Sequence, residues 1–199
     1  DRGGRNPAPL AANGRMFVQG DRVLFGLDAY NGTVLWTFFS HEMRRSNMPR
    51  DGSNMVATDD TLFVTIGSEC VALDAQTGKR RTAVHAAKGR DWGWLSASKG
   101  QLLTTTVKNG SEYKADDGEW YERFDVGKVE RVVSDTLVSH DPANGKKQWE
   151  YRGGAMMNST LTVADDAIYF VESRNTNLVR FATSRVMPDQ LTSQYLVAL

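Results

Sequence analysis

Short apolar runs recur along the chain, separated by clusters of Gly, Asn, Asp and other polar residues. Four pairs of these runs enclose a two-residue polar turn, which is the pattern of a β-hairpin. The four turns are Asn13-Gly14, Asp59-Asp60, Lys99-Gly100 and Asp165-Asp166. We therefore predict that the first strands of four hairpins lie at roughly 9–13, 54–58, 94–98 and 160–164.

A second repeated pattern follows the first three hairpins along the chain. An Asp ends an apolar run, and a Gly stands four residues later, where it supplies a positive φ without steric cost. The pairs are Asp28 with Gly32, Asp74 with Gly78, and Asp141 with Gly145. Trp36 and Trp149 stand eight residues after the first and third Asp, and Thr82 takes this place in the second repeat. In the fourth repeat the Asp is expected directly after Leu199.

Together the two patterns define a unit of two hairpins, that is, four short antiparallel strands. A β-sandwich could have similar spacing, but the repetition of one composition in each unit favours a β-propeller. We predict an all-β chain of about four four-stranded blades, at approximately 7–40, 52–84, 92–151 and 157–199, the last without its outer strand. Residues 1–199 are then a partial propeller.

The repeat at 72–79, Ala-Leu-Asp-Ala-Gln-Thr-Gly-Lys, resembles that of the pyrroloquinoline-quinone (PQQ) family of β-propellers, which includes quinoprotein alcohol dehydrogenases. Asp28–Trp36 and Asp141–Trp149 match the same repeat closely. The resemblance implies a complete ring of seven or eight blades. It also implies a structural, blade-docking role for Trp36 and Trp149 and for the Asp and Gly of each motif. The missing blades would come from the same protein, from a second half-propeller or from another chain.

Composition excludes only a few classes of function. Lys+Arg and Asp+Glu are 24 each, so the formal net charge is zero, which argues against a nucleic-acid-binding protein. The chain contains no apolar run of about 18 residues that could span a membrane. Cys70 is the single cysteine, so an internal disulfide is impossible. No spacing of His, Asp, Glu or Ser identifies catalytic residues or a metal site, and the catalytic residues stay unknown.

Candidate ligand-binding residues gather on one predicted face. The hairpin turns all fall at one end of the blades, while the longer connections fall at the other end, where binding residues are usually found. The candidates at that loop end are Arg50, Asp51, Arg90, Asp91, Trp92, Trp94, Asn158, Glu172 and Arg174. Recurrent Arg and Asp there could bind an anionic or polyhydroxylated ligand. The alternative is that these charges pair with one another and that both tryptophans belong to the loop core.

Three functions follow from the resemblance. The first is a non-catalytic propeller that binds a ligand or a protein, and the second is a scaffold of the bacterial envelope. The third is a fragment of a PQQ- and calcium-dependent quinoprotein dehydrogenase, with calcium bound by Glu172, Asn158 and either Asp51 or Asp91. The chain lacks the adjacent Cys-Cys pair that such enzymes often carry, so we expect no cofactor in this chain alone. The family also implies a periplasmic or extracellular location.

Overall fold

The computed structural model describes residues 8–43, 54–107, 133–164, 166–177 and 191–199, and it contains fifteen strands and one 3-10 turn. Blade one consists of β1 (Leu10–Ala12), β2 (Arg15–Gln19), β3 (Val23–Asp28) and β4 (Val34–Phe39). Blade two consists of β5 (Met55–Ala57), β6 (Thr61–Ile66), β7 (Glu69–Asp74) and β8 (Arg80–His85). Each is an antiparallel sheet whose strands follow in chain order, as the hairpin pattern predicts.

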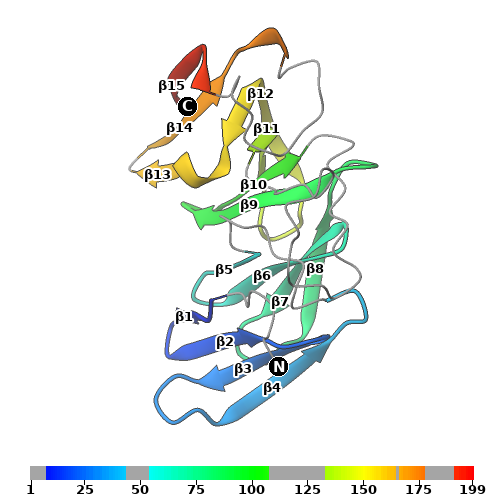
Figure 1. The fold of residues 1–199 in the computed structure, drawn as a ribbon. Helices are drawn as coiled ribbons and strands as arrows, with labels where there is room; N and C mark the ends of the chain where they lie inside the picture. Colours follow the sequence, from blue (N-terminus) through cyan, green and yellow to red (C-terminus); the bar gives the residue numbers. More distant parts are fainter. Residues whose placement is uncertain (1–7, 44–53, 108–132, 165, 178–190) are drawn as a thin grey trace, which may run out of the picture.

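Blade three consists of β9 (Asp91–Ser98), β10 (Gln101–Val107), β11 (Val133–His140) and β12 (Lys147–Met157). The 3-10 turn η1 (Asn158–Thr160) leads into blade four, whose described strands are β13 (Thr162–Ala164), β14 (Ala167–Ser173) and β15 (Gln194–Ala198). The blades stack in sequence order, from blue to red in Figure 1. The four predicted inner strands are thus present, at β1, β5, β9 and β13.

The strand β12 runs past the end of blade three. Its last residues pair with both neighbours, Met156 with Ser134 of β11 and Met156 with Glu172 of β14. Gly153 and Gly154 allow this approach, because a Cβ at Gly154 would collide with the Ser173 carbonyl. Blades three and four therefore belong to one continuous hydrogen-bonded sheet, whereas blades one and two are separate sheets.

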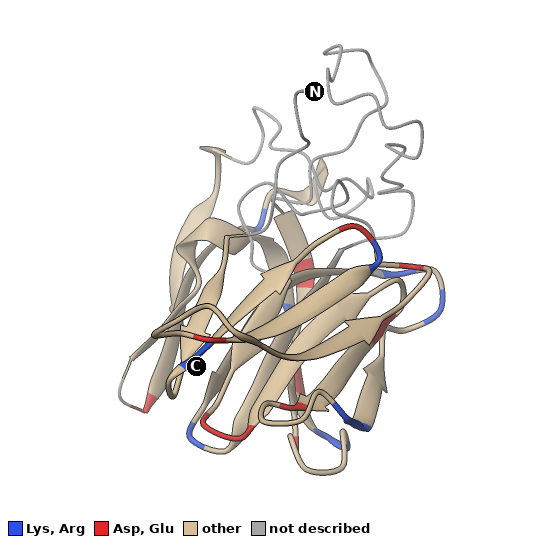
Figure 2. Ribbon diagram, turned by 90° about the horizontal axis from the view of Figure 1, so that it is seen from below, with Lys and Arg blue, Asp and Glu red and all other residues tan. Residues whose placement is uncertain are grey.

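Three apolar clusters hold the blades together. Phe17, Leu24 and Trp36 of blade one pack against Leu62 and Leu73 of blade two. Similar clusters join blade two to blade three and blade three to blade four. Lys, Arg, Asp and Glu lie mainly at turns and strand ends (Figure 2). No helix among the described residues is both long and apolar enough to cross a membrane.

The repeated Asp organises its turn by local hydrogen bonds. The Asp28 Oδ1 atom accepts from the backbone N–H groups of Tyr30 at 2.8 Å and Asn31 at 3.1 Å. The Gly32 N–H donates to the Asp28 carbonyl at 2.9 Å, and Gly32 has a φ of +75°. Asp74 and Asp141 form the same kind of turn, with Gly78 at a φ of +69° and Gly145 at +73°. The sequence motif is thus a folded unit stabilised within five residues.

These turns lie at the same end as the hairpin turns of the inner strands. The Ala29 N–H donates to the Gly14 carbonyl at 3.0 Å, and the Ala75 N–H donates to the Asp60 carbonyl at 2.9 Å. In blades one and two both kinds of turn therefore meet at one end, the turn end, and the inner strand begins at the opposite end, the loop end. This arrangement confirms the relative placement of the two sets of turns that the strand order predicts.

Trp36 lies between blade one and blade two. Its side chain is 7% exposed, and its Nε1–H donates to the Ala75 carbonyl at 3.0 Å. A Cβ at Gly78 would come within 2.6 Å of the indole, so only glycine lets the ring lie on this turn. The turn of blade three packs similarly on the outer strand of blade two, where a Cβ at Gly145 would be 3.1 Å from the Val84 side chain. The turn of one blade thus rests on the outer strand of the blade before it.

Asp74 gives the fold an acid-sensitive contact. The Arg81 guanidinium, 2.6 Å away, and the Thr77 hydroxyl lower the pKa of Asp74 to about 2. Because this value lies below the pKa of about 3.9 of an unfolded Asp, the carboxylate stabilises the fold fully above about pH 4. That stabilisation is lost as the pH falls through about 2.

We therefore expect Arg81→Gln to reduce the loss of stability between pH 4 and pH 2, as measured by urea unfolding at several pH values. Arg80→Gln is the matched control, because Arg80 pairs with Glu69 instead. Equal pH dependence in the wild type and in Arg81→Gln would contradict the assignment.

Candidate functional site

Arg90 precedes the inner strand of blade three at the loop end, and its guanidinium is bound within its own blade. Nε donates to the Thr106 hydroxyl at 2.9 Å, and Nη2 donates to Thr136 at 3.3 Å and forms an ion pair with Asp135. Burial, followed by the nearby positive charge of Arg152, lowers the pKa of Arg90. The side chain therefore braces strands β10 and β11. Its donors are directed at these neighbours rather than at an open ligand site.

Trp92 and Trp94 lie on opposite faces of blade three. A bulge in β9 places Leu95 opposite Thr104 and Trp92 opposite Thr106, so the alternation of faces shifts between them. Trp92 is 3% exposed and packs in the cluster that joins blades two and three. Trp94 packs against the cluster that joins blades three and four. The two rings thus do not form one aromatic surface for a flat ligand.

Asn158 belongs to a buried polar cluster between blades three and four. It is 1% exposed, and its Oδ1 accepts from the Thr105 hydroxyl at 3.2 Å. The Thr105 hydroxyl also accepts from the backbone N–H of Trp94 at 2.8 Å and from Ser134 at 3.0 Å. A Cβ at Gly93 would collide with Ser134 and Thr105, so this glycine lets the cluster close.

Glu172 lies nearby in β14 and is completely buried. Its Oε1 accepts from Arg174 Nε at 2.7 Å, and its Oε2 accepts from the Gly154 N–H at 2.8 Å. The Tyr151 hydroxyl lies 3.0 Å from both carboxylate oxygens. Burial, and then the hydrogen bond with Glu172, raise the pKa of Tyr151. The Arg174 guanidinium also lies over the Tyr195 ring, 4.4 Å from its centroid. This network connects β12, β14 and β15.

The remaining candidates are only partly described. Arg50 and Asp51 lie outside the described residues. The backbone of Asp91 begins β9 opposite Val107, at the end remote from the Lys99-Gly100 turn, as predicted. The side chain of Asp91 is outside the described part of the structure. Whether these residues share a depression with Trp94 therefore stays a prediction.

The donor set of Asn158 and Glu172 does not fit a calcium–quinone site. Ca²⁺ takes about six to eight oxygen ligands, but both Glu172 oxygens already accept hydrogen bonds, one of them from a guanidinium. An Arg174 cation beside the carboxylate would also repel a metal ion. Among the described residues, no three His, Cys, Asp or Glu side chains are placed to hold one. Cys70 is buried, which raises the pKa of its thiol to about 12.

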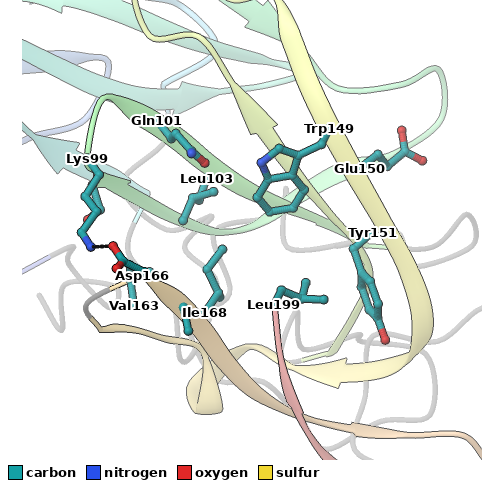
Figure 3. A pocket seen from close by; sticks show the side chains of 12 residues that line it. Lys99, Gln101, Leu103, Trp149, Glu150, Tyr151, Val163, Asp166, Ile168 and Leu199 are labelled. Carbon is teal, nitrogen blue, oxygen red and sulfur yellow. Dashed lines mark hydrogen bonds and ion pairs between the residues drawn. The ribbon is translucent and has the colours of Figure 1, made fainter.

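A cavity of about 550 Å³ lies at the turn end, between blades three and four (Figure 3). Apolar side chains of Leu103, Trp149 and Ile168 line it, and the ion pair of Lys99 with Asp166 lies on its rim. The sequence interpretation placed any pocket at the loop end, because the turns themselves are short. That expectation was wrong for this cavity, since its walls are the faces of neighbouring blades rather than the turns. The sequence carried no signal for this cavity, because the partial burial of the motif Trp149 is visible only in the structure.

Comparisons with known proteins agree with the observed blades. The family model described as "Outer membrane protein assembly factor BamB" matches residues 2–94. No curated protein sequence matches the chain. The fold is similar to quinohemoprotein alcohol dehydrogenase from Comamonas testosteroni, with a TM-score of 0.58, 13% identity and coverage of 98% of this chain and 35% of that one.

Two further solved structures share the fold. Quinohemoprotein alcohol dehydrogenase ADHIIG from Pseudomonas putida HK5 has a TM-score of 0.57 and 16% identity, covering 84% of this chain and 28% of that one. The Pan2 WD40 domain from Neurospora crassa has a TM-score of 0.58 and 13% identity, covering 97% of this chain and 48% of that one. The chain thus spans about a third of the length of these dehydrogenases. Its blades, its repeated Asp-Gly turns and the matching family model together identify a β-propeller built from PQQ-like repeats.

Proposed function

We propose that this chain is part of a non-catalytic PQQ-like propeller that acts as a protein-binding scaffold in the bacterial envelope. The observation that carries the proposal is the Glu172 network. The carboxylate that the family resemblance offers to calcium is held by Arg174, Tyr151 and the Gly154 N–H. These groups give the carboxylate a structural role between two blades.

Further support comes from the family model, whose description is that of an outer-membrane protein assembly factor. An assembly factor of this kind works in the periplasm, so we propose the same location here. Further blades would complete the ring, because relatives with this fold are longer chains. The complete propeller would then present its loop end and its outer strands to protein partners.

A binding experiment separates the scaffold from the dehydrogenase. The protein with its complete propeller is incubated with PQQ and Ca²⁺, gel-filtered and examined for quinone absorbance, with a quinoprotein dehydrogenase as positive control. We expect no quinone in the protein peak and no alcohol-dependent dye reduction. A quinone-to-protein ratio near one, with dye reduction, would establish the dehydrogenase reading instead.

Co-purification from the bacterial envelope tests whether the protein acts as a scaffold. A tagged protein isolated from solubilised envelopes should co-purify with the outer-membrane protein assembly machinery. Absence of that machinery from the purified material, at normal cellular levels of both, would contradict the proposal.

A further inference from the structure

A second cavity, of about 510 Å³, lies at the loop end between blades one and two, and we call it the loop-end cavity. The end of β4 with the residues that follow it, the hairpin of β6 and β7, and strand β8 surround it. Ile66 and Val71 in its wall are buried, whereas Phe39, His41 and Glu42 are exposed at its mouth. The cavity thus combines an apolar interior with an aromatic and acidic opening.

The segment that carries Glu42 is fixed in position by backbone hydrogen bonds on both sides. The Ser40 N–H donates to the Arg22 carbonyl at 3.0 Å, and the Arg22 N–H donates to the Met43 carbonyl at 2.9 Å. The Met43 side chain is buried in the apolar cluster between blades one and two. The opening of the cavity is therefore formed before a ligand binds, which lowers the entropic cost of binding.

The Glu42 carboxylate lies against the turn between β6 and β7. A Cβ at Gly67 would collide with Glu42 Oε2, and Gly67 has a φ of +56°, so both the space and the backbone favour glycine there. Within the part of the chain that the structure describes, no residue donates a hydrogen bond to this carboxylate or forms an ion pair with it. Glu42 thus brings an unpaired negative charge to the mouth of the cavity.

The other charged groups of the loop-end cavity pair with one another. Both carboxylate oxygens of Glu69 accept from Arg80 Nη2, at 3.2 and 3.1 Å, and His85 Nε2 lies 3.6 Å from the same carboxylate. Arg80 is therefore already engaged by an anion. Among the described residues, no three His, Cys, Asp or Glu side chains are placed to hold a metal ion. The charge left for a ligand is that of Glu42, so the cavity favours an organic cation.

The aromatic and apolar residues indicate which cation fits. Phe39 is 60% exposed, and its ring contacts that of His41 edge-on, with centroids 5.0 Å apart. A guanidinium group is planar, so it can stack on an aromatic ring while it pairs with a carboxylate. The methylene groups of an arginine side chain also pack well on apolar residues such as Ile66 and Val71. An arginine side chain therefore matches the cavity in charge, shape and polarity.

We propose that the loop-end cavity binds an arginine side chain of a protein partner, through an extended segment that also covers Phe39. The guanidinium pairs with Glu42, its methylene groups lie on Ile66, and an apolar residue next to the arginine packs on the Phe39 ring. Exposed aromatic side chains are typical of protein interfaces, whereas a free small cation has no group to cover Phe39. This inference rests on the proposed scaffold function, because it names a surface that holds a partner.

Isoleucine methyl resonances test the proposal, because the chain contains two isoleucines, Ile66 in this cavity and Ile168 in the cavity between blades three and four. The chain is labelled with ¹³C in the isoleucine δ1 methyl groups, which are assigned with Ile168→Val, and is titrated with acetyl-Gly-Leu-Arg-Gly-amide. We expect a saturable shift of the Ile66 resonance and none of the Ile168 resonance. The peptide with citrulline in place of arginine keeps the shape but lacks the charge, so it should bind about tenfold more weakly.

Glu42→Gln should likewise weaken binding of the arginine peptide by about tenfold, because the guanidinium loses its carboxylate. Asp21→Asn is the matched control. Asp21 is an exposed carboxylate in the turn between β2 and β3, at the same end of the blade, and it does not line the cavity. Its replacement should leave the affinity for the peptide unchanged. Circular dichroism checks that both variants fold, and the comparison of the two peptides needs no variant.

Three results would overturn the proposal: an Ile66 resonance that the arginine peptide does not shift, equal affinity for the citrulline peptide, or unchanged affinity in Glu42→Gln. Agmatine, a free guanidinium compound, tests whether the ligand is a small cation instead. If agmatine binds as tightly as the peptide, the cavity is not a docking site for a protein. If the protein co-purifies with the outer-membrane protein assembly machinery and Glu42→Gln does not change the yield, the scaffold function stands and the arginine site is wrong.

Discussion

Replacement of Trp36 by alanine should lower the free energy of unfolding by about 3–5 kcal/mol, the range for truncating a large buried aromatic side chain. The indole fills the space between the first two blades, in contact with Gly78, and is tilted against Phe17 with ring centroids 5.9 Å apart. Its removal also leaves the Ala75 carbonyl without its donor. Urea unfolding followed by far-ultraviolet circular dichroism measures the change.

Trp149→Ala provides the comparison for this result. From the sequence alone, both motif tryptophans are expected to contribute equally. The structure leads us to expect a smaller loss for Trp149→Ala in residues 1–199, since this ring is half-buried beside an open cavity. A loss below about 1 kcal/mol for Trp36→Ala would show that the ring does not join the blades.

Glu172→Ala should be destabilising by about 2–5 kcal/mol, because two donors inside the blade junction lose their acceptor and each lost partner costs about 1–3 kcal/mol. The Arg174 side chain is half exposed, so water replaces most of its interaction with the carboxylate. The substitution would strand the Tyr151 hydroxyl and the Gly154 N–H between the blades and would leave Arg174 without its carboxylate. Glu172→Gln keeps an oxygen that can accept from the Gly154 N–H, so it should lower the free energy of unfolding by less than Glu172→Ala does. Thermal and urea unfolding of the wild type, Glu172→Ala and Glu172→Gln measure the order of their stabilities.

Glu150→Ala is the control, because Glu150 pairs with cations as Glu172 does, here Lys147 and Arg152, but near the surface. Solvent screening limits such pairs to about 0–1 kcal/mol. If Glu150→Ala and Glu172→Ala cost the same, burial of the Glu172 carboxylate would not be the source of its contribution.

The turns could be predicted from the sequence because their interactions are local. Asp28 bonds to residues two and three positions further along, and Gly32 closes the same turn, so a five-residue motif carries the whole geometry. The inner strands followed from the hairpin turns for the same reason. The PQQ-like repeat was therefore recognisable before any tertiary contact was known.

The arrangement of the candidate site residues could not be predicted from local sequence motifs in this way. Trp92 and Trp94 separate onto two faces because of a bulge that depends on how β9 pairs with β10. The Glu172 network joins residues that are distant in sequence and meet only when β12 crosses to β14. The adjacent Gly153 and Gly154 in a strand were the available signal, since glycines there often mark a close backbone approach.

Because β12 continues into blade four, the blades differ in whether they can open independently of their neighbours. Blades three and four share backbone hydrogen bonds, at Ala155 with Ser173 and Met156 with Glu172, so neither can open without breaking part of the other's sheet. Blades one and two are separate sheets, and side chains such as Trp36 pack between them. Local unfolding tends to follow units of this kind. Blades one and two can thus separate at the interface where their apolar side chains meet. The amide hydrogens of blades three and four, in contrast, should exchange with solvent in one cooperative opening of their shared sheet.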